Sequence, residues 1–173
     1  MTHFEMHPSN GLIYFEHGDG SLYRSGDRIK TYDTNSGEIK IYIDRPGGAT
    51  NPRLSPDGKK LAYIHRDDRQ TVLVIHDIYS KEEKVINRQL DFDRQDSGSF
   101  YGSYPNLAWH PNGREVFVTY NGGIHGIKVA NGNVRNIEFE ALVDRDVKNT
   151  IRFKVDIPQE LVTTRSHRWS QKT

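Results

Sequence analysis

A threefold internal repeat constrains this sequence more than any other feature. Residues 5–15, 53–64 and 108–118 each show a large apolar residue, a polar residue, proline, a turn pair that ends in glycine, and an alternating run. Proline presets φ for the first turn position, and glycine accepts the positive φ that such tight turns require. Each stretch is therefore predicted to be a hairpin tip, with its turn formed by Pro8 and Gly11, by Pro56, Asp57 and Gly58, or by Pro111, Asn112 and Gly113.

A second hairpin pattern follows each of these turns, over residues 28–43, 72–86 and 124–137. Each unit thus contains about four short strands joined by tight turns, which is typical of a propeller blade. Gly58 follows Gly11 by 47 residues, and Gly113 follows Gly58 by 55. These spacings suit four-stranded blades with connecting loops of variable length.

The predicted fold is all-β, a partial β-propeller of about three four-stranded antiparallel blades plus the start of a fourth. The blade units cover approximately 1–48, 49–103 and 104–140, and 141–173 is predicted to be a connecting strand and the start of the next blade. Blades bury their faces only against neighbours, so three blades leave two exposed flanks. We therefore expect the chain to be a fragment that needs the rest of a parent chain, to pair with a second copy of itself, or to curl around its own C-terminal strand.

Composition excludes several other classes of protein. Ile, Leu, Val and Phe supply 41 of the 173 residues, which is more than a disordered chain carries. A net charge of +1 lacks the electrostatic footprint of a nucleic-acid-binding protein, and the absence of cysteine excludes disulfides and a thiol nucleophile. The N-terminus lacks the pattern of a signal peptide, and no apolar run predicts membrane insertion.

The repeat residues resemble a known family. Leu-Ser-Pro-Asp-Gly-Lys-Lys-Leu-Ala-Tyr at 54–63 and Ala-Trp-His-Pro-Asn-Gly at 108–113 resemble the repeats of TolB-like, WD40-like β-propellers. A narrower likeness is to two-domain proteins in which such a propeller precedes a metal-dependent amidohydrolase domain; it rests on 104–109, 121–124, 137–141, 151–153 and 168–171. In that family the metal ligands lie in the barrel domain, and no residue here matches them. The resemblance implies a periplasmic or extracellular setting and no cofactor or catalytic residue in this chain.

The eight histidines do not form a recognised metal motif. His7 and His110 stand at the turn position that Ser55 occupies in the second repeat, so we expect each to cap its own turn. His76 with Asp77, and His65 with Asp67 or Asp68, could form base-and-orienter pairs. No serine in a strand–elbow–helix context accompanies them, so we expect exposed polar residues of hairpins instead.

The segment around residues 90–104 holds the candidate ligand-binding residues. Clustered carboxylates suit calcium, but the spacing departs from an EF-hand, so we expect a solvated acidic loop rather than a cation site. The nearby aromatic side chains are predicted either to form a recognition surface or to cover a neighbouring blade. The residues concerned are Asp91, Asp93, Asp96, Phe100, Tyr101 and Tyr104.

The resulting hypothesis is a non-catalytic scaffold or interaction module from a larger hydrolase-associated protein. An enzyme, a lyase or hydrolase with a His and Asp site in a propeller channel, is the first alternative. A free-standing adaptor that binds peptide or saccharide is the second.

Overall fold

The computed structural model describes residues 4–17, 27–92, 107–147 and 149–152. The chain divides into two compact units, residues 1–139 and residues 140–173. Within the described ranges all regular secondary structure is β-strand. These ranges contain no helix that is long and apolar enough to cross a membrane.

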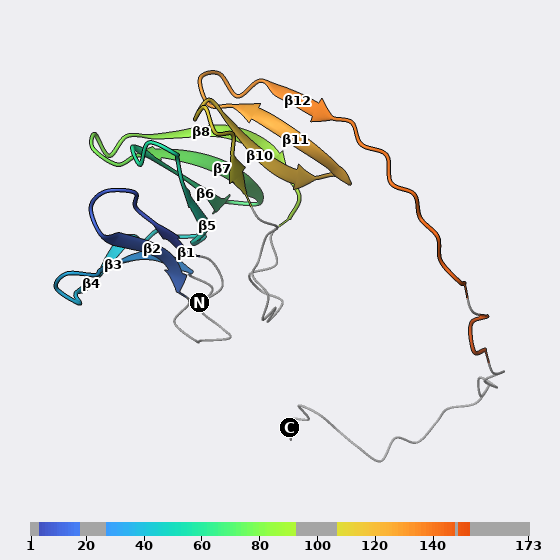
Figure 1. The fold of residues 1–173 in the computed structure, drawn as a ribbon, viewed down its shortest axis with the longest axis horizontal. Coiled ribbons are helices and arrows are strands. Elements are labelled where there is room, and N and C mark those ends of the chain that lie inside the picture. The colour runs from blue at the N-terminus through green and yellow to red at the C-terminus, as the bar shows by residue number, and fades with distance from the viewer. Residues whose placement is uncertain (1–3, 18–26, 93–106, 148, 153–173) are drawn as a thin grey trace, which may run out of the picture. The chain divides into compact units, whose positions relative to one another are not determined.

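Three four-stranded antiparallel sheets make up the first unit (Figure 1). Blade 1 consists of β1 (Phe4–Met6), β2 (Leu12–His17), β3 (Arg28–Asp33) and β4 (Ile39–Ile43). Blade 2 consists of β5 (Ala49–Leu54), β6 (Lys60–Asp67), β7 (Gln70–Asp77) and β8 (Glu83–Leu90). Blade 3 consists of β9 (Ala108–Trp109), β10 (Glu115–Tyr120), β11 (Gly123–Lys128) and β12 (Val134–Ile137). In every sheet consecutive strands are neighbours, which confirms the predicted all-β partial propeller.

Blade 2 packs on both of its neighbours, because successive residues of a strand point to opposite faces of the sheet. Leu61 and Tyr63 of β6 belong to the apolar cluster shared with blade 1. Ala62 and Ile64 of the same strand belong to the cluster shared with blade 3. All four side chains are fully buried. The core is therefore divided into two separate interfaces between neighbouring blades.

The innermost strands β1, β5 and β9 are connected through Arg53. Its Nη1 donates a hydrogen bond to Glu5 Oε1 on β1 at 2.7 Å, and its Nε donates to the Leu107 carbonyl at 3.2 Å. Trp109 Nε1 in turn donates to the Arg53 carbonyl oxygen at 2.9 Å. One side chain of blade 2 thus bonds to both neighbouring blades on the inner side of the array.

The second unit is described at residues 140–147 and 149–152, which form no strand. Leu142, Val147 and Ile151 of this segment expose almost their whole side chains. The predicted start of a fourth blade at residues 168–173 lies outside the described residues.

Candidate functional site

The predicted turn residues lie between the first two strands of each blade. Gly11, Gly58 and Gly113 have φ values of 72°, 69° and 69°. His7 Nδ1 accepts a hydrogen bond from the Ser9 N–H at 3.2 Å, and His110 Nδ1 accepts one from the Asn112 N–H at 3.2 Å.

The His7 ring also joins two turns. Because its Nδ1 accepts, its Nε2 carries the proton and donates to the Gly58 carbonyl oxygen at 3.0 Å. Ser55 Oγ caps the blade 2 turn by accepting from the Lys60 N–H at 2.9 Å. The side chains before the prolines therefore act in turn formation.

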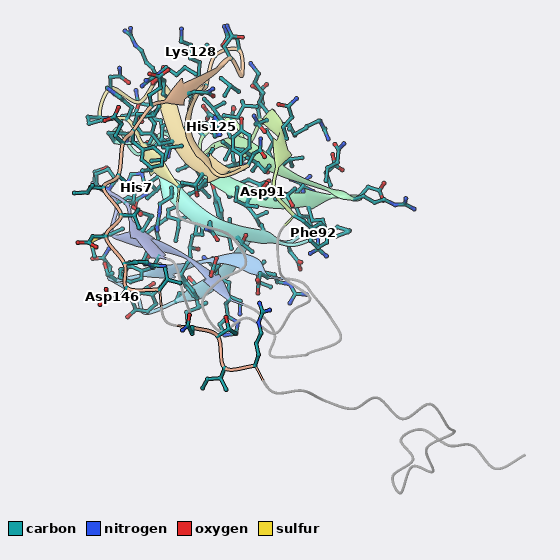
Figure 2. The ribbon with its side chains drawn as sticks, turned by 90° about the vertical axis from the view of Figure 1, so that its right-hand side faces the viewer. His7, Asp91, Phe92, His125, Lys128 and Asp146 are labelled. Carbon is teal, nitrogen blue, oxygen red and sulfur yellow. The ribbon has the colours of Figure 1, made fainter. Side chains whose placement is uncertain are left out.

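Of the candidate ligand-binding residues, Asp91 is described. It lies just after β8, where its Oδ2 accepts a hydrogen bond from the Asn121 N–H at 2.9 Å (Figure 2). Within the described ranges no group of three or more His, Asp or Glu side chains could hold a metal ion. The other candidates lie outside the described residues, so their role in ligand binding stays a prediction: Asp93, Asp96, Phe100, Tyr101 and Tyr104.

The two base-and-orienter pairs are not formed. His76 Nδ1 donates to Glu83 Oε1 at 3.2 Å, while Asp77 Oδ1 accepts from the backbone of its own turn at 2.9 and 3.0 Å. His65 Nδ1 contacts the Gly48 carbonyl oxygen at 2.8 Å, and Asp67 pairs with an arginine on β8. His76 and Asp77 are adjacent on β7 and point to opposite faces, whereas Asp67 bonds to Arg88 on β8 instead of to His65. Both histidines are buried, so the expectation that they are exposed hairpin residues was wrong.

A hydrogen-bonded network around Glu83 joins blades 1 and 2, and the sequence analysis missed it. Tyr63 Oη donates to Glu83 Oε1 at 2.8 Å, and Arg45 Nη1 lies 2.6 Å from Tyr63 Oη and 2.8 Å from Glu83 Oε2. His76 Nε2 accepts from Tyr42 Oη at 3.1 Å. These groups satisfy one another at the interface, so they stabilise the packing of the two blades.

Burial and partners in this network shift several pKa values. Burial raises the pKa of Tyr63, and its hydrogen bond to Glu83 adds to the effect. Burial opposes the charged form of Glu83, but the Tyr63 hydrogen bond and the Arg45 charge outweigh it and lower the pKa of that carboxyl. Burial lowers the pKa of His65 and of His76, so both rings are neutral at pH 7.

We expect stability to fall on mild acidification. An unfolded chain protonates its histidines near pH 6.5, whereas folded His65 and His76 resist protonation. The titration of these rings therefore leaves the free energy of unfolding unaffected above pH 6.5. Below pH 6.5 it falls by at most about 1.4 kcal/mol per pH unit for each ring. Urea unfolding at pH 7.5 and pH 5.5 measures this loss.

Replacement of both rings, His65→Gln with His76→Gln, should flatten the pH dependence. His17→Gln, at an exposed position, is the matched control and should keep the wild-type dependence. A wild-type free energy of unfolding that is equal at the two pH values would contradict the expectation.

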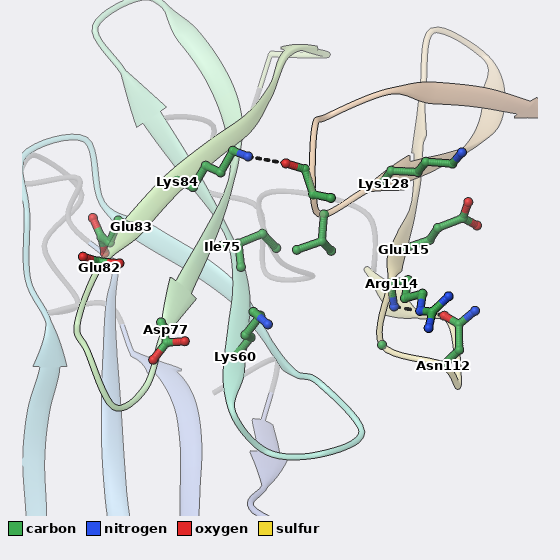
Figure 3. A pocket seen from close by; sticks show the side chains of 13 residues that line it. Lys60, Ile75, Asp77, Glu82, Glu83, Lys84, Asn112, Arg114, Glu115 and Lys128 are labelled. Atoms are coloured by element: carbon green, nitrogen blue, oxygen red, sulfur yellow. Dashed lines mark hydrogen bonds between the residues drawn. The ribbon is translucent and has the colours of Figure 1, made fainter.

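A cleft of about 1200 Å³ lies between blades 2 and 3 (Figure 3). It opens at the end of the blades that carries the Pro–x–Gly turns. The blade 2 wall comes from the start of β6, the end of β7 and the start of β8. The blade 3 wall comes from residues 112–115 and 128–130. Blade 3 therefore contributes residues from two of its hairpin turns, whereas blade 2 contributes strand ends beside its β7–β8 turn.

Both walls of this cleft are charged. The charged lining residues include the cations Lys60, Lys84, Arg114 and Lys128 and the anions Asp77 and Glu82. Glu83 and Glu115 also line it, but their carboxylates bond elsewhere, to Tyr63 and Arg45 and to Arg135. Hydrogen bonds from its own turn amides lower the pKa of Asp77, and the Arg135 guanidinium lowers the pKa of Glu115. Lys84 Nζ crosses the cleft to the Ala130 carbonyl oxygen at 2.5 Å (Figure 3). The cleft is therefore a polar surface that carries both signs of charge.

Parts of this chain match curated proteins. A stretch of 71 residues is 34% identical to the Tol-Pal system protein TolB of Histophilus somni strain 129Pt. It covers 41% of this chain and 15% of that protein. The protein of the same name from strain 2336 is 37% identical over 59 residues, which are 34% of this chain and 13% of that protein. No protein-family model matches the sequence.

Solved structures share the blade arrangement. TolB from Acinetobacter baumannii superposes with a TM-score of 0.56 at 16% identity, over 78% of this chain and 32% of that one. Putative TolB from Agrobacterium tumefaciens gives 0.58 at 18% identity, over 79% and 45%. The chain has a TolB-like propeller fold. This confirms the family likeness of the repeats that the Pro–x–Gly turns predicted.

The TolB-like fold is shared with enzymes as well. Oligogalacturonate lyase in complex with manganese superposes with a TM-score of 0.56 at 12% identity, over 77% of this chain and 35% of that one. At such identities the likeness shows the fold alone. This chain spans less than half the length of the TolB proteins it matches.

Proposed function

We propose that this chain is a non-catalytic propeller scaffold that binds an extended peptide in the cleft between blades 2 and 3. The cleft itself carries the proposal, since it is a roomy groove with charged walls beside the repeat turns. Extended peptides combine backbone hydrogen-bonding groups with side chains of either charge. Such a ligand can face Lys60 and Arg114 with carboxylates and Asp77 with a cation.

The chemistry of the walls favours peptide over saccharide. Sugar rings commonly stack on aromatic side chains, and none of the described residues that line the cleft is aromatic. Drug-sized ligands prefer mostly apolar pockets, whereas eight of these lining residues are charged. A chain-like ligand with alternating charge matches the walls best.

The same lining supports a binding role rather than catalysis. Its described residues include no Ser, Thr, Tyr, His or Cys that could act as a nucleophile beside a base. The neighbouring His76 is held between Tyr42 and Glu83 in the blade 1–blade 2 interface. A reversible binding site is the simplest chemistry that these groups support.

Charge reversal in the cleft is expected to weaken peptide binding by at least about tenfold, because two cations that face ligand carboxylates become anions. The change is Lys60→Glu with Arg114→Glu, and the probe is a fluorescent decapeptide of alternating Lys and Glu, followed by anisotropy at low salt. Lys59→Glu is the matched control, because Lys59 precedes Lys60, is exposed and lies outside the lining.

Three outcomes would overturn the proposal. The first is absence of peptide binding by the wild-type chain, and the second is binding that the Lys59 variant weakens as much as the double variant does. The third is turnover of oligogalacturonate in the presence of manganese, which would favour the lyase alternative that the shared fold suggests.

The scaffold proposal extends to the protein context. We propose that the chain is related to the propeller part of larger, hydrolase-associated proteins, with either the rest of a parent chain or a second copy of itself as its partner. Its partial coverage of the TolB proteins supports the propeller part of this proposal. The likeness to TolB is the support for a periplasmic or extracellular setting.

A further inference from the structure

The face of blade 1 that points away from blade 2 is apolar, and among the described residues of the first unit no other strand packs on it. One cross-strand row on this face runs through all four strands, from Met6 through Ile13 and Tyr32 to Ile39. Met6 and Ile39 expose 62% and 58% of their surface. Beside this row lies a groove of about 300 Å³, lined by Phe4, Ile13, Phe15, Tyr32 and Ile39. A contiguous apolar face of this kind marks an interaction site.

The strand register shows what this face is built to contact. Leu54 pairs with Leu61 across the Pro–x–Gly turn of blade 2, and both pack on blade 1. Trp109 pairs with Val116 across the equivalent turn of blade 3, and both pack against blade 2. The pair at the same position of blade 1 is Met6 with Ile13. The outer face of blade 1 therefore corresponds to the faces with which blades 2 and 3 each pack on the preceding blade.

Blade 3 carries the complementary face. On blade 2, Lys84 extends from the face toward the following blade and bonds to the Ala130 carbonyl of blade 3. On blade 2, Lys84 ends a cross-strand row with Ala62 and Ile75. The equivalent row on blade 3 is Phe117, Gly126 and Arg135, so Arg135 corresponds to Lys84. Arg135 pairs with Glu115 at 2.9 Å and lies 5.6 Å from the centre of the Phe117 ring. Blade 2 contacts blade 3 through the Lys84 position. At the equivalent position, blade 3 presents an aromatic ring and a guanidinium.

We propose that two copies of this chain associate head to tail, with blade 3 of each copy packed on the outer face of blade 1 of the other. Closed propellers contain about four to eight blades. Three blades per copy give six blades for two copies, and a third copy would exceed the usual range. Each contact joins the outer face of blade 3 in one copy to the outer face of blade 1 in the other. A two-fold axis relates the two contacts. Both exposed flanks are then covered at once.

The first test is the mass of the chain in solution. Sedimentation equilibrium of the wild-type protein over a wide concentration range should give twice the 19.9 kDa of one chain. Ile39→Asp should raise the dissociation constant at least about a hundredfold, because each of the two contacts would bury an unpaired carboxylate. The position is exposed within one copy, so circular dichroism should stay as in the wild type.

Tyr79→Asp is the matched control, because Tyr79 is 71% exposed and lies in the β7–β8 turn, away from both outer faces. This variant should remain a dimer. A wild-type monomer at all concentrations would overturn the proposal. An Ile39→Asp dimer as tight as the wild type would do the same.

A mixing experiment tests the head-to-tail arrangement. Arg135→Glu should also weaken the dimer, since it places two carboxylates together on the blade 3 face. When the Ile39→Asp and Arg135→Glu chains are mixed, one of the two contacts is again wild type. Heterodimers should therefore form more readily than either homodimer. A mixture with no preference for heterodimers would exclude the packing of blade 3 on blade 1.

Discussion

Gly47→Ala is expected to lower the free energy of unfolding by at least about 3 kcal/mol. Gly47 lies between β4 and β5 with φ of 85°, where L-residues are strained. A Cβ at this position would come within 1.9 Å of the Arg66 carbonyl oxygen, which is backbone and cannot rotate away. The Gly47 carbonyl also accepts a hydrogen bond from the Arg66 N–H at 3.3 Å. The connection between blades 1 and 2 would have to shift.

Gly37→Ala provides the matched control. Gly37 has a similar φ of 74°, but its Cβ would meet nothing within 4 Å. The loss should therefore be about 1 kcal/mol, from the backbone strain alone. Urea denaturation of both variants measures the difference, and equal losses would show that the contact with Arg66 does not constrain the linker.

Leu61→Ala is expected to cost about 3 kcal/mol, because it removes a fully buried side chain from the blade 1–blade 2 cluster. Each blade contacts only its neighbours, so the damage should be local. Hydrogen exchange should show faster exchange in β2 and β3 than in β10 and β11.

Two companion variants make this prediction specific. Leu142→Ala is the same substitution at a fully exposed position and should change stability by less than about 0.5 kcal/mol. Leu73→Ala, in the blade 2–blade 3 cluster, should loosen blade 3 instead of blade 1. Uniform acceleration of exchange in all three blades, whichever leucine is changed, would contradict the division of the core into two interfaces.

The arrangement of the strands could be predicted from local sequence, because turns depend on the residues that form them. Gly58 follows Pro56 and Asp57, and this spacing alone indicates a tight turn between two strands. The three repeats of this pattern were sufficient to predict antiparallel blades, and the structure confirms them.

The contacts between blades could not be predicted in this way, because they depend on how neighbouring sheets pack. The side chain of His76 bonds to Glu83 and Tyr42, seven and thirty-four residues away, rather than to Asp77 beside it. One signal was available: in an antiparallel hairpin around the turn at 78–82, His76 stands opposite Glu83. The cleft between blades 2 and 3 had no such signal, since its walls come from two different sheets.

The residues that form the turns also determine where the protein is most prone to deamidation. Asn10 Oδ1 and Asn112 Oδ1 accept hydrogen bonds from N–H groups two residues on, at 3.0 and 2.9 Å, and each asparagine precedes a glycine. Asparagine before glycine is prone to deamidation, which yields aspartate or isoaspartate. Asp57 already fills this place in blade 2, with its Oδ1 3.1 Å from the Lys59 nitrogen. Aspartate at position 112 would therefore reproduce a turn the molecule already contains, whereas isoaspartate would lengthen the backbone there. Of these three turns, deamidation during storage should begin in blades 1 and 3 and spare the central blade.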